Sequence, residues 1–199
     1  TPLIKKLLQD YLKLDSHHCH VYPFFKLGLN KSSFKKASNN FVFISSSVPH
    51  KNHKRLIEAF VLAANRVNQE IRLHLTINKI HRFSVGLPNN LKIIFHGNLS
   101  TDSVNKLYNI SEFAIYPSLV ESFGLPLIEA ADHDCKVIAS DLPYVHEIIK
   151  PSLAFDPYSV ESISTSILRA ISENLPETKV LVENKLNNFM ELITNQDVQ

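Results

Sequence analysis

The sequence predicts an α/β fold: an open, doubly wound, mostly parallel sheet of about six strands with helices on both faces. Two observations predict it. Short runs rich in β-branched and aliphatic residues recur along the chain, which is typical of strands that are buried on both faces. Segments with apolar residues at helical spacing separate these runs, and this alternation indicates parallel strands joined by helices.

The start of the chain differs from the rest. Residues 1–14 carry leucines at nearly helical spacing and predict an amphipathic helix. Residues 15–40 contain the strand-like HVYPFF and then Lys-, Ser- and Asn-rich text without periodicity, which predicts a connector. The sequence HHCH at 17–20 holds metal-ligand residue types, but no second cluster completes a tetrahedral site. We therefore assign these residues to the connector rather than to a metal centre.

Regular structure is expected from residue 41 onward. The apolar run FVFISS at 41–46 predicts a buried strand, and HKRLIEAFVLAANRVNQ at 53–69 carries one apolar stripe and predicts a helix. Alternation in IRLHLTI at 71–77 predicts a second strand. KIIFHG at 92–97 is a third strand that ends at a glycine.

The next elements follow the same rhythm. STDSVNKLYNI at 100–110 predicts a helix with Ser100 as its N-cap. EFAIYP at 112–117 is a strand that a proline closes, GLPLIEAADHD at 124–134 is a helix, and KVIAS at 136–140 is a strand.

The last part of the chain predicts one more strand among helices. PYVHEIIK at 143–150 reads as a short helix and LAFDP at 153–157 as a strand. SVESISTSILRAISEN at 159–174 is a helix, and a final helix covers roughly 177–194.

Composition fits an ordinary globular protein of one domain or slightly more, with 199 residues, 44% hydrophobic and 20% charged. The net charge of +2 comes without the clustered Lys and Arg that nucleic-acid binding needs, so we expect no nucleic-acid partner. Cys19 and Cys135 make no disulfide framework and fit a reducing, cytoplasmic compartment. No apolar run approaches the roughly 18 residues of a membrane span, and the start lacks the pattern of a signal peptide.

The stretch ESFGLPLIEA, residues 121–130, carries the clearest functional signal. In parallel sheets, ligands bind outside the carboxyl ends of the strands, and Glu121 follows the fourth predicted strand. Phe123, Gly124 and Leu125 then open a helix whose free N–H groups point toward that edge and can seat a phosphate. Glu129 lies about one helical turn further and still reaches the same side.

Three roles compete for the two glutamates: an acid/base pair, clamps for sugar hydroxyls, or surface charge. A carboxylate beside a phosphate seat repels phosphate and should instead accept hydrogen bonds from hydroxyls. The acid/nucleophile pair of a glycosidase fits poorly, since such carboxylates flank the scissile bond from separate elements. Lys51, at the carboxyl end of the first strand, can neutralise charge that builds on a leaving diphosphate.

Three segments, in order, resemble retaining glycosyltransferase family 4, which has the GT-B fold. They are FVFISSSVPHKNHKRLIEAF, the Glu-x7-Glu stretch YPSLVESFGLPLIEA, and KVIASDLPYVHEII. The resemblance implies that residues 41–175 form a Rossmann-like donor domain, one half of a GT-B architecture. Residues 1–40 are then the remnant of, or crossover from, a missing acceptor domain, and residues 176–199 a C-terminal helix. Because the chain also lacks an initiator Met, we expect a piece of a longer enzyme, or a half that acts with a partner chain.

The resemblance also implies roles for single residues. Glu121 lies near the transferred sugar and Glu129 holds the ribose, while Lys51 contacts the diphosphate. The backbone of Phe123, Gly124 and Leu125 faces the diphosphate and sugar, Gly97 and Asn98 fall where the base is wrapped, and Ser118 helps to shape the pocket. We place Ser46 with these donor-binding residues, although the family often has Arg there.

Some residues depart from the family pattern or imitate another site. With Ser46 in place of Arg, one cation is missing unless Lys54 or Arg55 substitutes, and Asp134 stands where the family usually has Gly. Donor affinity or catalytic power is then reduced, or built differently. The sequence DHD at 132–134 imitates a metal-binding Asp-x-Asp, but it falls at a helix end, so we assign it no metal. His53 could touch phosphate, yet a solvated helix start is the better interpretation.

The implied function is transfer of a hexose, with retention, from a UDP- or GDP-linked sugar to a glycan or lipid-linked acceptor. No cofactor and no metal are expected. The C-terminal text is similar to bacterial O-antigen and capsule transferases, which places the protein in the cytoplasm, peripheral at the inner face of the membrane. The alternative is a non-catalytic or degenerate sugar-nucleotide-binding module that acts with a partner. A dinucleotide-dependent dehydrogenase is disfavoured because SSSVPHK after the first strand contains no glycine.

Overall fold

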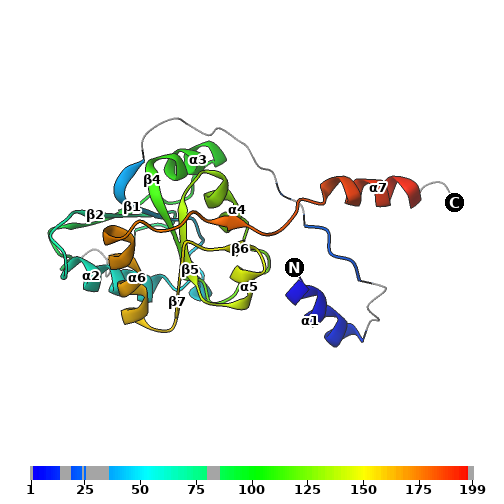
Figure 1. Ribbon diagram of the computed structural model, residues 1–199, viewed down its shortest axis with the longest axis horizontal. Coiled ribbons are helices and arrows are strands. Elements are labelled where there is room, and N and C mark those ends of the chain that lie inside the picture. The colour runs from blue at the N-terminus through cyan, green and yellow to red at the C-terminus, as the bar shows by residue number, and fades with distance from the viewer. Residues whose placement is uncertain (1, 14–18, 24, 26–35, 80–85, 197–199) are drawn as a thin grey trace.

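A six-stranded parallel sheet forms the centre of the protein. The computed structural model describes residues 2–13, 19–23, 25, 36–79 and 86–196 (Figure 1). The strands run in the spatial order β3-β2-β1-β4-β5-β7, and every neighbouring pair is parallel. Their bounds are β1 Ala37–Phe43, β2 Ile71–Leu75, β3 Leu91–Phe95, β4 Ser111–Tyr116, β5 Lys136–Ser140 and β7 Leu153–Phe155. The predicted fold class, a Rossmann-like doubly wound sheet of about six strands, is confirmed.

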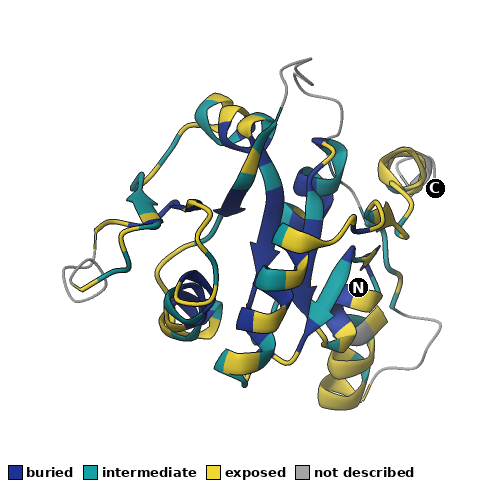
Figure 2. Ribbon diagram, turned by 60° about the vertical axis from the view of Figure 1, so that its left-hand side comes forward, coloured by how far each residue is buried: buried dark blue, intermediate teal, exposed yellow. Residues whose placement is uncertain are grey.

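Helices cover both faces of this sheet (Figure 1). Helices α2 and α6 pack on each other on one face, while α3 and α4 lie on the other and contact β4. Burial follows the same layering, with the central strands mostly dark and the outer helix surfaces exposed (Figure 2). The helices are α2 His53–Ala64, α3 Thr101–Ile110, α4 Leu125–Asp132, α5 Pro143–His146 and α6 Val160–Ser172.

Aromatic side chains tie the two central strands to the helix above them. Phe41 of β1 stacks on Phe113 of β4 at 4.8 Å between ring centroids and meets Phe60 of α2 edge-on at 5.2 Å. All three side chains are buried. Aromatic pairs of this kind add to the hydrophobic stabilisation that burial already gives, so the packing holds β1 and β4 firmly side by side.

Several element bounds differ from the predicted ones. The first strand is Ala37–Phe43, so residues 44–46 already lie beyond its carboxyl end. The helix predicted for 53–69 ends at Ala64, and its last turn gives way to Asn65 as C-cap. Ser100 is confirmed as an N-cap, because its side chain accepts a hydrogen bond from the Ser103 N–H.

The prediction of a helix over 143–150 was wrong in its second half. Helix α5 stops at His146, and β6, Ile149–Lys150, pairs antiparallel with β8, Lys179–Val180. Because β8 occupies the start of the region predicted as the last helix, that helix begins later, with α7 at Leu186–Gln196. The helix predicted for roughly 177–194 included β8, because a strand of two residues is too short to interrupt the helical spacing of apolar residues.

The terminal segments lie away from the main sheet (Figure 1). Helix α1, Pro2–Leu12, leads to a connector that touches the segment before α7. There the Lys185 N–H donates to the Pro23 carbonyl at 2.6 Å, and the Tyr22 ring lies 5.9 Å from that of Phe189. The described part of HVYPFF contains no strand, contrary to the strand-like reading. Within the described chain, none of the helices combines the length and apolar character that crossing a bilayer requires.

Candidate functional site

A cavity of about 470 Å³ lies at the carboxyl edge of the sheet, where β1 stands between β2 and β4. The chain leaves β1 toward one side of the sheet and returns on the other, which makes this edge the switch point at which open α/β sheets bind ligands. The cavity is lined by Ile44, Ser45, Ser46, Lys51, Thr76, Asn98, Leu99, Val104 and Pro126. Three predicted site residues, Ser46, Lys51 and Asn98, are thus brought together.

Lys51 and Glu121, predicted to contact different parts of one ligand, contact each other. Lys51 ends a short 3₁₀ turn at Pro49–Lys51, and its Nζ lies 2.5 Å from Glu121 Oε1. Their side chains are only 12% and 11% exposed. The ammonium also lies 5.6 Å from the centre of the Tyr116 ring, within cation–π range. A largely buried charge pair therefore stands at the cavity, with Lys51 in its lining.

Tyr116, the last residue of β4, is a site residue that the sequence analysis missed. Its side chain and its hydroxyl oxygen are buried. Burial, and then the nearby negative charge of Glu121, raise the pKa of Tyr116 above its ordinary value. A neutral phenol therefore lies beside the Glu121 carboxylate. A tyrosine at the carboxyl end of a predicted strand was the available signal.

Asn52 was also missed, and it joins the loops that carry Lys51 and Glu121. Its Nδ2 donates to the Pro117 carbonyl at 3.2 Å and to the Pro157 carbonyl at 2.8 Å, and its Oδ1 accepts from Arg55 at 3.0 Å. The side chain is buried and the backbone has φ 61°, a left-handed conformation that Asn tolerates. An Asn directly before a predicted helix was the signal.

A backbone hydrogen bond reinforces this connection. The N–H of Leu119 donates to the His50 carbonyl at 2.8 Å. Ser118 next to it is fully buried, and its carbonyl accepts from Ser140 Oγ at 2.9 Å and from the Tyr144 hydroxyl at 2.7 Å. Ser118 thus anchors the loop that carries Glu121 to Ser140 and Tyr144. It is not among the residues that line the cavity.

Gly124 allows the turn into α4. It adopts φ 80° as the N-cap residue, and Pro126 stands in the first turn, where a missing N–H costs nothing. A Cβ on Gly124 would lie 3.1 Å from Leu127 Cδ1 and 3.4 Å from Ile148 Cδ1. The first turn of α4 thus starts beside the cavity, which Pro126 lines, and this end of the helix carries partial positive charge.

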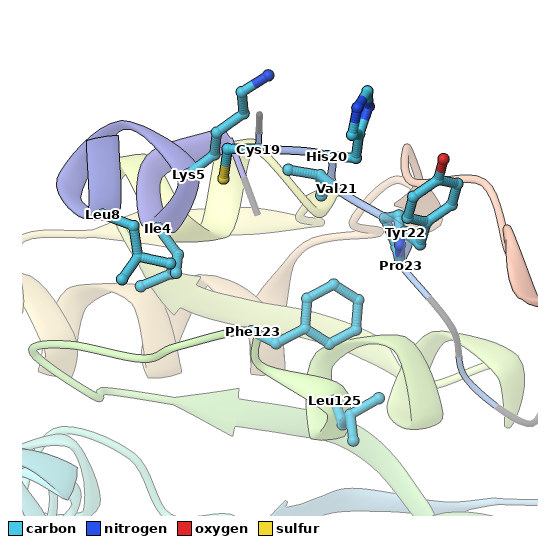
Figure 3. Close-up of a pocket in the computed structure, with 10 residues that line it drawn as sticks. All are labelled: Ile4, Lys5, Leu8, Cys19, His20, Val21, Tyr22, Pro23, Phe123 and Leu125. Atoms are coloured by element: carbon cyan, nitrogen blue, oxygen red, sulfur yellow. The ribbon is translucent and has the colours of Figure 1, made fainter. Parts of the chain in front are cut away.

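The side chains of Phe123 and Leu125 contribute to a second cavity rather than to the first. This cavity of about 400 Å³ lies between α1, the connector and the start of α4 (Figure 3). Cys19 and His20 also line it, whereas His17 and His18 lie outside the described residues. Only the backbone of the Phe123–Leu125 segment was predicted to face a ligand, and the second cavity does not test that prediction.

Glu129 lies one turn into α4 and is half-buried. Its Oε2 accepts a hydrogen bond of 3.4 Å from the hydroxyl of Tyr108, which is itself fully buried in α3. Burial raises the pKa of Glu129, and the Tyr108 hydrogen bond and His133 oppose that rise. The carboxylate is therefore a strong, partly desolvated acceptor.

Gly97, which was predicted to lie where the base is wrapped, adopts a left-handed backbone conformation that favours glycine. Gly97 has φ 66°, and a Cβ there would lie 2.9 Å from Asn78 Oδ1. The N–H of Gly97 donates to the Ile77 carbonyl at 3.1 Å, so β2 and β3 remain joined beyond their ends. Asn98 follows as an exposed residue that lines the first cavity.

Two histidines, His53 and His133, are more buried than the sequence predicted. His53 is 7% exposed, its Nε2 lies 2.9 Å from Ser45 Oγ, and burial followed by the charge of Lys51 lowers its pKa to about 4. The solvated helix start was therefore wrong, because the ring packs on Phe43 at 5.1 Å. His133 caps α4 at its C-terminus as predicted for a helix end, but it is buried and stacks on Tyr108.

The structure also bears on the two departures from the family pattern, Asp134 in place of Gly and Ser46 in place of Arg. Asp134 adopts φ 56°, which explains why a glycine suits this position. Lys54 points outward, where its Nζ lies 3.9 Å from Glu58, and Arg55 holds Asn52. Among the described residues that line the first cavity, Lys51 is the only cation, so neither neighbour replaces the missing Arg there.

Comparison with known proteins identifies the family. The sequence profile described as "Glycosyl transferases group 1" matches residues 29–187. The chain belongs to this family. The match covers the whole sheet and the Lys51 and Glu121 loops, and the domain has the GT-B type of Rossmann-like fold.

Curated relatives of this glycosyltransferase domain include enzymes of surface polysaccharides. The "O-antigen chain mannosyltransferase RfbU" of Salmonella typhimurium is 30% identical over 154 residues, which are 75% of this chain and 43% of that protein. The "Capsular polysaccharide biosynthesis glycosyltransferase CapH" of Staphylococcus aureus is 24% identical over 92% of this chain and 52% of that protein. The chain thus spans about half the length of these relatives.

Solved structures with the same fold include glycosyltransferases. A mutant of S. aureus TarM, in complex with Fondaparinux, alpha-GlcNAc-glycerol and UDP, superposes with a TM-score of 0.68 at 19% identity, over 83% of this chain and 35% of that chain. The pneumococcal O-GlcNAc transferase GtfA, in complex with UDP and GlcNAc, gives a TM-score of 0.66 at 17% identity, over 87% of this chain and 38% of that chain.

Proposed function

We propose that this chain is the donor-binding half of a retaining, metal-independent hexosyltransferase that uses a UDP- or GDP-linked sugar. One observation carries the proposal: Lys51 and Glu121 meet at the cavity of the switch point, next to the start of α4. A cation, a hydroxyl acceptor and the positive end of a helix are what a nucleoside diphosphate sugar requires of its site.

In this proposal the residues act on different parts of the donor. Lys51 and the first turn of α4 bind the diphosphate and stabilise the negative charge that it gains as the glycosidic bond breaks. Glu121 accepts hydrogen bonds from hydroxyls of the sugar. Glu129 accepts hydrogen bonds from the ribose, while Asn98 and the backbone at Gly97 border the base.

The acceptor and the cellular role are part of the same proposal. The acceptor is a glycan or a lipid-linked glycan, and the pathway builds a cell-surface polysaccharide, as the names of the RfbU and CapH relatives suggest. A second, amino-terminal domain supplies the acceptor site, in the same polypeptide or as a partner chain. The protein works in the cytoplasm at the inner face of the membrane.

Calorimetric titration of the chain with UDP, GDP and their sugars tests the donor site. Glu129→Ala should weaken nucleoside diphosphate binding by about 10- to 100-fold, because a hydrogen bond to a charged group is worth about 1.5–3 kcal/mol. Glu173→Ala is the matched control, since it removes an exposed carboxylate that pairs with Arg169 on α6. Absence of binding at millimolar concentration, or unchanged binding by Glu129→Ala, would contradict the proposal.

A degenerate binding module is the second candidate, because Ser46 leaves the cavity with one cation fewer than the family pattern expects. A transfer assay with and without a co-expressed amino-terminal half distinguishes the two candidates. Donor binding without turnover in the complete pair would favour the module. Turnover by the isolated chain would contradict our expectation that it needs the other half.

A further inference from the structure

The ion pair between Lys51 and Glu121 raises a question about the order of events at the donor site. If Lys51 binds a diphosphate, its Nζ has to leave or share the Glu121 carboxylate that lies 2.5 Å away. Both side chains are largely shielded from water, so screening between them is weak. The carboxylate and a bound diphosphate are therefore competitors for one ammonium group.

The surrounding loops do not separate to relieve this competition. The Leu119 N–H bond to the His50 carbonyl and the Asn52 bond to the Pro117 carbonyl tie the two loops on either side of the pair. The buried ring of Tyr116 also lies against the ammonium group of Lys51. With the loops joined in this way, rotation of the Lys51 and Glu121 side chains is enough to exchange the partners of Lys51.

The exchange has different consequences for a sugar nucleotide and for a nucleoside diphosphate. When a sugar nucleotide draws Lys51 to its phosphates, the sugar hydroxyls replace the ammonium as hydrogen-bond donors to Glu121. When the diphosphate is alone, Glu121 loses Lys51 and gains no donor in return. The pair thus disfavours the product more than the substrate.

We propose that Glu121 is an intramolecular competitor of the product diphosphate: once the sugar has left with the acceptor, Glu121 reclaims Lys51 and promotes release of the nucleoside diphosphate. This inference rests on the proposed function and assigns a second role to the same carboxylate. No bond is made or broken in the step, since Lys51 only changes its ion-pair partner.

Glu121→Gln tests the inference because it keeps the shape of the side chain and removes its charge. We expect this variant to bind UDP or GDP about tenfold more tightly than the unaltered chain in calorimetric titrations. The corresponding sugar nucleotide should gain less or lose affinity. Glu58→Gln is the control: it removes one exposed carboxylate from neighbouring α2, and we expect it to leave the affinity unchanged.

A double-mutant cycle separates competition for Lys51 from simple charge repulsion. In the background of Lys51→Met, the gain from Glu121→Gln should disappear, whereas general repulsion of the phosphates would persist. Glu121→Asp, which keeps the charge on a shorter side chain, should give an intermediate affinity and serves as a second variant.

The possible outcomes are distinct. If the unaltered chain binds no nucleotide, the proposed function itself fails. If it binds, and Glu121→Gln binds UDP or GDP equally or more weakly, the donor site stands and the inference is refuted. A gain of equal size in the Lys51→Met background also refutes it, because the competitor would then not act through Lys51.

Discussion

The side chain of Asn52 should contribute more to stability than that of Asn39, which lies at the amino end of β1 and is less buried. Asn52 is 5% exposed, and its amide group satisfies the carbonyls of Pro117 and Pro157. We consider Asn52→Gly and Asn52→Ala, because the residue has φ 61°. Glycine keeps this backbone conformation without strain and removes only the side chain, whereas alanine introduces strain as well.

The magnitude follows from the groups that lose a partner. Each of the two buried carbonyls left without its donor costs about 1–3 kcal/mol, so Asn52→Gly should lower the free energy of unfolding by about 2–6 kcal/mol. Left-handed backbone costs alanine about 1–2 kcal/mol. The entropy that glycine adds to the unfolded chain offsets about 0.4–1 kcal/mol of this difference. Asn52→Ala should therefore be less stable than Asn52→Gly by roughly 0.5–1 kcal/mol.

Urea unfolding at pH 7 measures these differences, and Asn39→Gly is the matched control. Asn39 also has a positive φ, of 58°, but it lies at the amino end of β1, where its side chain makes one exposed hydrogen bond of 3.3 Å to the Glu70 carbonyl. Asn39→Gly should therefore lower the free energy of unfolding by less than about 1 kcal/mol. Equal losses at the two positions would refute the reasoning.

A binding measurement on the same variants tests positioning apart from stability. If Asn52 positions Lys51 at the cavity by joining its loop to Pro117 and Pro157, the folded Asn52→Gly variant should bind nucleoside diphosphate more weakly at a temperature well below its unfolding transition. Asn39→Gly should bind normally. Unchanged affinity in Asn52→Gly would restrict Asn52 to a purely structural role.

Two further predictions concern pH and backbone strain. The pKa of His53 is lowered to about 4 from 6.5, so the unfolded state binds more protons between these values and stability falls as pH drops through this window. Between pH 7 and 5, His53→Gln should lose about 2 kcal/mol less than the unaltered chain in urea titrations, and parallel losses would contradict the assignment. Gly124→Ala should cost about 1–3 kcal/mol, from its φ of 80° and the approach to Leu127. Gly86→Ala, with φ 71° and nothing within 4 Å of the added Cβ, should cost less, and equal unfolding midpoints would show that packing at Gly124 is unimportant.

The sheet could be predicted because its strands are buried on both faces. Runs such as those of β4 and β5 are nearly continuous apolar segments between polar turns, and this pattern depends on the sequence alone. The short pairing of β6 with β8 could not be predicted, since a two-residue strand leaves no periodicity to read. Its partners lie about 30 positions apart, and only the fold brings them together.

The candidate site was predictable as a set of residues but not as a set of contacts. Lys51, Glu121 and Gly124 follow from the character of strand ends and helix starts. That Lys51 pairs with Glu121, and that His53 is buried against Phe43, depends on side chains from different elements. Local sequence indicates polarity at a helix start, whereas burial there depends on what packs over it.

The register of β1 against β4 explains why this site tolerates an irregular strand. Asn39 interrupts the ladder, and the register shifts between Ala37 and Phe41, at the amino end of β1. From Phe41 onward the pairing with Phe113 and then of Val42 with Ala114 is regular. Because a one-residue slip would turn every later side chain to the opposite face, regular pairing beyond the shift is what lets the loops of Lys51 and Glu121 leave the sheet side by side. The irregularity therefore lies at the amino end of β1, opposite the cavity, and the edge that carries Lys51 and Glu121 is held by paired backbone and stacked aromatic rings.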